Sequence, residues 1–126
     1  MAEGFTLQIE IKGVAEFGRL LDRLSNAVRG QVVQDALLAG AYIVEGYAKV
    51  GVPVDTGFLR GSIQSVRGPE NSAIVAVAAE YAPYVEYGTS RMGAQPYMRP
   101  AVDQHIPEIT QAVAENLSDG IARALR

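Results

Sequence analysis

The sequence predicts an α+β fold in which a small, mostly antiparallel sheet packs against a long helix, with a short N-terminal helix and a C-terminal helix. Three observations carry this prediction. Residues 5–12 alternate apolar and polar side chains, which is typical of a half-buried strand. Residues 28–49 and 106–124 repeat apolar side chains every three or four positions, which is typical of amphipathic helices. Two further apolar stretches flank a Gly-Pro-Glu-Asn turn and complete the sheet as a hairpin.

Length and composition favour a single domain, residues 1–126. The formal charge is −3 and basic residues do not cluster, which disfavours a protein that grips nucleic acid through its phosphates. The chain has no cysteine and one histidine, so we expect neither a disulfide nor a zinc site of the common Cys/His kind. No apolar stretch reaches the roughly 18 residues of a membrane span, and the N-terminus lacks a signal-peptide pattern. We therefore expect no membrane association and no export.

The first half of the chain predicts two helices after the first strand. Apolar residues at helical spacing from residue 14 to 24 predict a short amphipathic helix. Ser25 and Asn26 offer side chains that cap a second helix, expected from Val28 to Lys49. One face of this helix carries Val33, Leu37, Gly40, Val44 and Tyr47. A Gly-Val-Pro sequence then ends it.

The middle of the chain predicts one helical turn and the hairpin. Asp55 can accept a hydrogen bond from a backbone amide about three residues later, so we expect a structural cap and a single helical turn that ends by Gly61, with Gly57 serving the turn. Strands are expected over 62–67 and 72–80. The second strand has Val75 and Val77 on one face and Ile74, Ala76 and Ala78 on the other. Because both faces are apolar, we expect both to be covered, in part by another subunit.

Residues 81–101 hold four of the six tyrosines and three of the six prolines. Pro83 suits the first position of a short helix over 83–87, and Gly88 suits the position after its end. The glycine-containing segment 89–95 is expected to be an exposed and mobile loop, and Pro100 to open the last helix. Pro107 should bend or split that helix near Asp103. The apolar stripe of this helix comprises Ile106, Ile109, Val113, Leu117, Ile121 and Ala124.

No group of residues predicts catalysis, a cofactor or a metal. His105 lies just before Pro107 with no serine motif near it, so a solvated helix residue is the better interpretation. Asp55, Glu80 and Glu86 are the carboxylates near turns, and each has a structural explanation: a cap, a strand end, and a partner for an arginine. The tyrosines favour a protein interface over base stacking because few basic residues accompany them. Core packing remains the alternative for Tyr81 and Tyr84.

Three blocks of sequence resemble a known family. The blocks are Pro53-x-Asp55-Thr56-Gly57-x-Leu59-Arg60, then Tyr81-Ala82-x-Tyr84-Val85-Glu86-Tyr87-Gly88-Thr89, then Pro96-Tyr97-Met98-Arg99-Pro100-Ala101. Their order and spacing resemble the gene-product-ten family of lambdoid siphophages, which are tail components or neck (head-tail joining) proteins. Phe58 stands where a polar residue is common in the family, and Tyr97 where phenylalanine is common.

The resemblance implies a structural virion protein rather than an enzyme. It would assemble as a homo-oligomeric ring, usually a hexamer, at the head-tail junction of a phage or phage-like particle, after folding in the host cytoplasm. Its partners would be head-closure or portal proteins and tail-terminator or tail-tube proteins, and DNA would pass without sequence-specific binding. A second hypothesis is that the acidic excess faces the channel, so that DNA does not stick. The alternatives are a monomeric adaptor or regulatory binding module and a small phage enzyme.

We expect the interface of such a ring within the tyrosine-rich stretch. The hypothesis takes Tyr84, Tyr87, Tyr97 and Met98 as its hydrophobic part. Arg60, Glu86 and Arg99 are taken as a polar cluster that fixes the register. A heterologous ring needs two different complementary patches on each subunit, and the stripe of the terminal helix is the second candidate.

Overall fold

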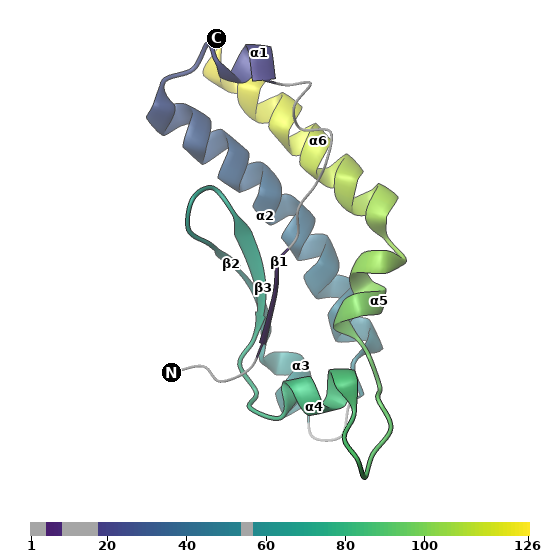
Figure 1. The fold of residues 1–126 in the computed structure, drawn as a ribbon. Helices are drawn as coiled ribbons and strands as arrows, with labels where there is room; N and C mark the ends of the chain where they lie inside the picture. Colours follow the sequence, from purple (N-terminus) through teal and green to yellow (C-terminus); the bar gives the residue numbers. More distant parts are fainter. Residues whose placement is uncertain (1–4, 9–17, 54–56) are drawn as a thin grey trace.

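The computed structural model describes residues 5–8, 18–53 and 57–126, which form three strands and six helices. Their order is β1 (Phe5–Gln8), α1 (Gly18–Leu21), α2 (Asn26–Gly51), α3 (Phe58–Gly61), β2 (Ile63–Arg67), β3 (Ala73–Val77), α4 (Ala82–Tyr87), α5 (Met98–Asp103) and α6 (Ile106–Ala124). The sheet lies along one side of the long helix α2, and α6 runs antiparallel to α2 on another side (Figure 1). The predicted α+β class is confirmed.

Helix α2 has the predicted cap and terminating sequence, and it extends two residues beyond the predicted range of Val28 to Lys49 at each end. Ser25 has extended backbone, and its side chain accepts a hydrogen bond from the Val28 amide at 3.3 Å, which satisfies one of the unpaired N–H groups of the first turn. At the other end Val52 turns to extended backbone before Pro53, and its amide still bonds to the Ala48 carbonyl. The predicted face is only partly right: Gly40 and Val44 are buried, whereas Val33, Leu37 and Tyr47 are half-buried.

The three described strands are antiparallel in the order β1-β3-β2. Ile63 of β2 and Phe5 of β1 both pair with Val77 of β3. The β2–β3 turn places Glu70 and Asn71 in the left-handed region, at φ 53° and 59°, which is the geometry of tight hairpin turns. The predicted hairpin is therefore confirmed.

Side chains of α2 hold this hairpin in place. The Gln34 amide donates to the carbonyls of Gly68, at 2.9 Å, and Ser72, at 3.1 Å, on the two sides of the turn. Nearer the helix C-terminus, the Glu45 carboxylate accepts from the Ser65 amide at 2.7 Å and pairs with Lys49 at 3.0 Å. Although burial raises the pKa of Glu45, the hydrogen bonds from Lys49 and Ser65 outweigh it and hold the pKa below the ordinary value. The register of the sheet on the helix is thus fixed by polar contacts as well as by packing.

One face of the hairpin packs on α2, and the other is half-exposed. Val75 and Val77 have 0% and 2% of their surface exposed, whereas Ile74 and Ala76 are half-buried and Ala78 is exposed. Among the described residues, α2 thus covers one face of the hairpin. The expected second cover by another subunit stays a prediction.

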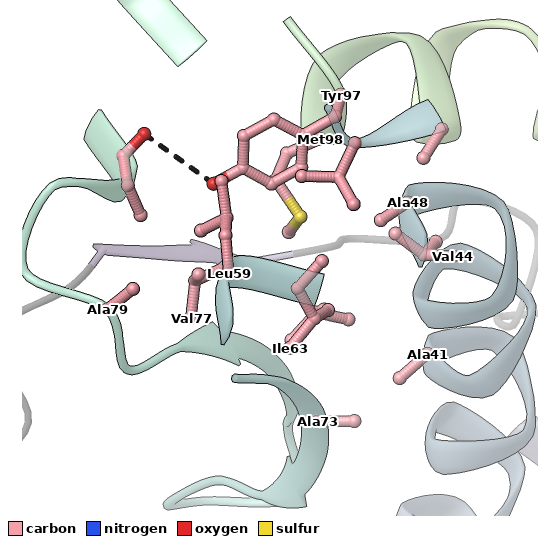
Figure 2. Close-up of a cluster of buried hydrophobic side chains, with 14 of the residues drawn as sticks. Ala41, Val44, Ala48, Leu59, Ile63, Ala73, Val77, Ala79, Tyr97 and Met98 are labelled. Carbon is pink, nitrogen blue, oxygen red and sulfur yellow. Dashed lines mark hydrogen bonds between the residues drawn. The ribbon is translucent and has the colours of Figure 1, made fainter. Parts of the chain in front are cut away.

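The main core lies between α2, the sheet and the start of α5. Figure 2 shows Val44 and Ala48 of α2 facing Ile63 of β2, with Tyr97 and Met98 filling the space at the end of the sheet. A second cluster joins α1, α2 and α6. Gly120 allows α6 to approach α2 closely, because a Cβ there would lie 3.1 Å from a Val32 methyl.

The C-terminal stretch is split as Pro107 predicts. Helix α5 ends at Asp103, and α6 begins at Ile106 with Pro107 in its first turn. Pro100 lies in the first turn of α5 instead of opening one long last helix. The stripe of α6 packs against α2 within the subunit, with Ile109, Val113, Leu117 and Ile121 at most 3% exposed. Ile106 and Ala124, at the two ends of the stripe, are exposed. The buried middle of the stripe is therefore not available as the second interface patch of a ring.

Several predictions fall outside the described residues. They are the Asp55 cap, the strand residues beyond Gln8, and the first part of the 14–24 helix. The described part of that helix is α1.

Candidate functional site

Exposed aromatic side chains gather at one end of the molecule. Helices α3 and α4 and the following loop form this end, opposite α1 and the C-terminus (Figure 1). Phe58, Tyr84 and Tyr87 are 62%, 57% and 63% exposed, and Tyr81 and Met92 are also exposed. The Phe58 and Tyr81 rings lie 6.2 Å apart between centroids at a tilt of 32°. We call these five side chains the aromatic end.

The aromatic end borders an open groove of about 490 Å³. Its lining is mainly apolar and comes from α3, α4, residues that precede these helices, and the loop after α4: Pro53, Gly57, Phe58, Leu59, Tyr81, Val85, Met92 and Gln95. Gly57 precedes α3 at φ +81°, a left-handed conformation that favours glycine. The predicted turn role of Gly57 is thus consistent with its backbone, and it brings Phe58 to the surface.

Glu86 is the buried polar group that positions this end. It is 4% exposed, and its carboxylate accepts three backbone hydrogen bonds: from Tyr97 and Met98 to Oε1, both at 2.9 Å, and from Arg99 to Oε2 at 3.1 Å. These amides open α5, where unpaired N–H groups and the helix dipole both favour a negative charge. Glu86 therefore caps α5 from α4, across the loop.

The loop between α4 and α5 is closed at its base. The Gln95 amide donates to the Val85 carbonyl at 2.8 Å, beside the Glu86 contacts. Thr89 turns the loop, since its amide donates to the Met92 carbonyl and its hydroxyl accepts from the amides of Arg91 and Met92. The segment 89–95 is exposed, as predicted. Its base is nevertheless held by α4.

Gly88 and Pro83 serve this arrangement as predicted. Pro83 lies in the first turn of α4, which begins one residue earlier, at Ala82. Gly88 has φ +78°, and a Cβ on it would lie 2.7 Å from the Ala94 amide nitrogen. Only glycine fits there without moving the loop.

The structure corrects two parts of the interface hypothesis. Tyr97 and Met98 are 1% and 0% exposed, so they lie in the subunit core and offer no surface to a neighbour. The Tyr97 hydroxyl donates to the Ala82 carbonyl at 3.5 Å (Figure 2). Burial raises the pKa of Tyr97. The burial of these two residues could not be predicted, because a cluster of tyrosines in the sequence does not show which side chain points into the core.

The expected cluster of Arg60, Glu86 and Arg99 does not form as an ion-paired group. Glu86 contacts Arg99 through its backbone amide, and both arginine side chains are exposed. Arg91 in the loop is exposed too, and none of the three arginines forms an ion pair among the described residues. Exposed arginines thus lie in α3, in the loop and in α5, and the exposed Glu80 precedes Tyr81. Sequence reasoning missed Phe58 and Met92, although the departure of Phe58 from the family pattern was the available signal.

The remaining candidates have structural surroundings. His105 stacks on Tyr47 with ring centroids 3.4 Å apart, and the Tyr47 hydroxyl donates to Glu108 at 2.5 Å. Glu80 is exposed in the turn before α4, because β3 ends at Val77 and does not reach the predicted residue 80. In the described segments, no three His, Cys, Asp or Glu side chains are grouped so as to hold a metal ion. None of the helices described is both long and apolar enough to cross a membrane.

Comparison with known proteins identifies a family. The family model described as "Bacteriophage HK97-gp10, putative tail-component" matches residues 15–88, which is more than half of the chain. The match includes α2, the hairpin, α3 and α4, and it ends at Gly88. No curated protein and no solved structure matches the chain.

Proposed function

Because the chain belongs to the HK97-gp10-like family of phage tail components, we propose that it is a structural virion protein that forms a ring at the head-tail junction. In this proposal identical subunits, six in a ring that matches the tail, join the portal or head-closure proteins to the tail-terminator or tail-tube proteins. DNA passes through the opening without sequence-specific binding. The family supports a phage tail-related structural protein, and we propose its position at the head-tail junction.

The aromatic end is the observation that carries the proposal. Phe58, Tyr84 and Tyr87 each expose more than half of their surface, although aromatic side chains gain most from burial. Tyrosine and arginine are also the residue types that dominate binding energy in protein interfaces. Glu86 and the closed loop base hold the surface in one shape, which lowers the entropy lost on association. These features fit a permanent protein interface better than a solvent-exposed surface.

The test removes two aromatic side chains of the aromatic end and keeps the fold. Tyr84→Ser with Tyr87→Ser replaces two exposed side chains, so the free energy of unfolding should change by less than about 1 kcal/mol. Complete particles should fall at least tenfold when this variant replaces the wild-type protein, and heads and tails should accumulate separately.

The matched control is Leu20→Ser with Val28→Ser. These residues are exposed by 40% and 42% and lie at the opposite end of the molecule. The control should assemble normally. Full assembly by the Tyr84 and Tyr87 variant would refute the role of the aromatic end, and a protein absent from wild-type particles would refute the virion role itself.

A further inference from the structure

A heterologous ring needs a second surface, and the outer face of α2 provides one. Residues 39, 42, 43, 46 and 50 recur at helical spacing on one face in the C-terminal half of α2. They are Ala39, Tyr42, Ile43, Gly46 and Val50, and all are exposed or half-buried. Tyr42 is 57% and Val50 78% exposed. We call these five residues the α2 outer face.

Gly46 is the unusual member of this face. It lies in the interior of a 26-residue helix, where glycine is less stable than alanine. A Cβ at Gly46 would meet nothing within 4 Å, so packing among the described residues does not require a glycine. By contrast, Gly120 of α6 faces Val32 at 3.1 Å and has a packing reason. A side chain or backbone that approaches α2 closely from outside the subunit gives Gly46 the same reason.

The charges beside this face suit the aromatic end. Tyr47 follows Gly46 and lies one helical turn from both Ile43 and Val50. Its hydroxyl holds the exposed Glu108 carboxylate at 2.5 Å, which places an acidic group at the border of the α2 outer face. On the elements that carry the aromatic end, and at the start of α5, Arg60, Arg91 and Arg99 are exposed, and Glu80 is exposed beside Tyr81. Both surfaces are apolar, and Glu108 at the border of one gives the exposed arginines near the other a partner of opposite charge.

We propose that the α2 outer face of one subunit receives the aromatic end of the next copy of this chain. An exposed aromatic ring packs over Gly46 between Tyr42 and Val50, and an arginine approaches Glu108. The contact joins two different surfaces, so it is heterologous and closes into a ring when the rotation per subunit allows. This inference rests on the proposed ring and names the second surface that the ring needs.

Cross-linking tests the contact directly, because the chain has no cysteine. Gly46→Cys places a thiol on the α2 outer face, and Ser90→Cys places one in the exposed loop at the aromatic end without removing a ring. Particles carrying both substitutions are treated with a short bismaleimide and separated under denaturing conditions. We expect a ladder of covalent multimers that ends at the ring size. Either single variant should give monomer only.

The matched control is Val28→Cys with Ser90→Cys. Val28 is exposed on the same helix but lies 18 residues before Gly46, about 27 Å along the axis. This pair should give no ladder. A second variant, Gly46→Gln, should melt at a higher temperature than the wild type as an isolated protein, yet reduce complete particles at least tenfold.

The outcomes separate this inference from the proposed function. If particles contain the protein but give no ladder, the proposed contact is wrong, whereas the proposed ring at the head-tail junction is not contradicted. A link between two Gly46→Cys positions, or a link from this position to a different virion protein, overturns it too. Wild-type particle yield with Gly46→Gln has the same meaning. Absence of the wild-type protein from particles overturns both proposals.

Discussion

Replacing Glu86 by alanine should strongly destabilise the folded subunit. The carboxylate is 4% exposed and accepts hydrogen bonds from three amides at 2.9, 2.9 and 3.1 Å. Removing it leaves the first amides of α5 without an acceptor, two of them on the buried residues Tyr97 and Met98. The perturbation therefore affects both a helix cap and the core.

The magnitude follows from the cost of unpaired buried groups. Each hydrogen bond to a charged group contributes about 1.5–3 kcal/mol, and the three share one carboxylate, so their contributions do not add fully. We expect a loss of about 3–5 kcal/mol, the range found when one partner of a buried charge interaction is removed. Glu86→Gln retains an oxygen acceptor and should lose about 1–2 kcal/mol. Since the free energy of unfolding of a native domain is about 5–15 kcal/mol, Glu86→Ala removes a large part of the stability of the subunit.

Urea unfolding followed by circular dichroism measures the loss. With a slope near 2 kcal/mol/M, Glu86→Ala should lower the midpoint by about 2 M. Glu80→Ala is the matched control, because Glu80 is an exposed carboxylate six residues earlier, and its midpoint should stay close to the wild type. A loss below about 1 kcal/mol for Glu86→Ala would refute the view that this carboxylate holds the aromatic end together.

Two further predictions concern the loop and the hairpin. Gly88→Ala should lower the free energy of unfolding by about 1–3 kcal/mol, because Gly88 has φ +78° and a Cβ would lie 2.7 Å from the Ala94 nitrogen. Gly93→Ala is the control, since a Cβ there meets nothing within 4 Å. Equal melting temperatures for the two variants would contradict the argument. Glu45→Gln should reduce the acid sensitivity of the protein. Since the folded pKa of Glu45 lies below the ordinary 4.5, its charge stabilises the wild type above that pH, and the stabilisation is lost as pH falls through the folded pKa. Urea midpoints between pH 7 and 3 check this, and parallel curves for both proteins would show that Glu45 contributes nothing.

The elements were predictable because their signals are local. Ser25 caps α2, a Gly-Val-Pro sequence ends it, and the turn at Glu70 and Asn71 forms where the sequence places it. Pro107 separates α5 from α6 for the same reason, since a proline suits the first turn of a helix and disrupts its interior. In each case a few neighbouring residues determine the backbone.

The details of the site were less predictable because they depend on contacts across a loop. Glu86 was expected to pair with an arginine, yet it bonds to amides 11 to 13 residues later, and no periodicity reports such a contact. Tyr84 and Tyr97 each follow a proline in the sequence, but Tyr84 is 57% exposed and Tyr97 1%. Which ring turns inward is decided by the path of the chain between α4 and α5. The sequence thus pointed to the stretch and to two of its exposed rings, Tyr84 and Tyr87, but not to Phe58 or to the burial of Tyr97 and Met98.

Images of assembled particles test the central claim most directly. A particle in which this chain carries a visible label should show density in a ring at the junction between head and tail, with the aromatic end of each subunit against α2 of its neighbour. Label found only along the tail tube or at its distal tip would contradict the proposed position, and particles without the label would contradict a role in the virion.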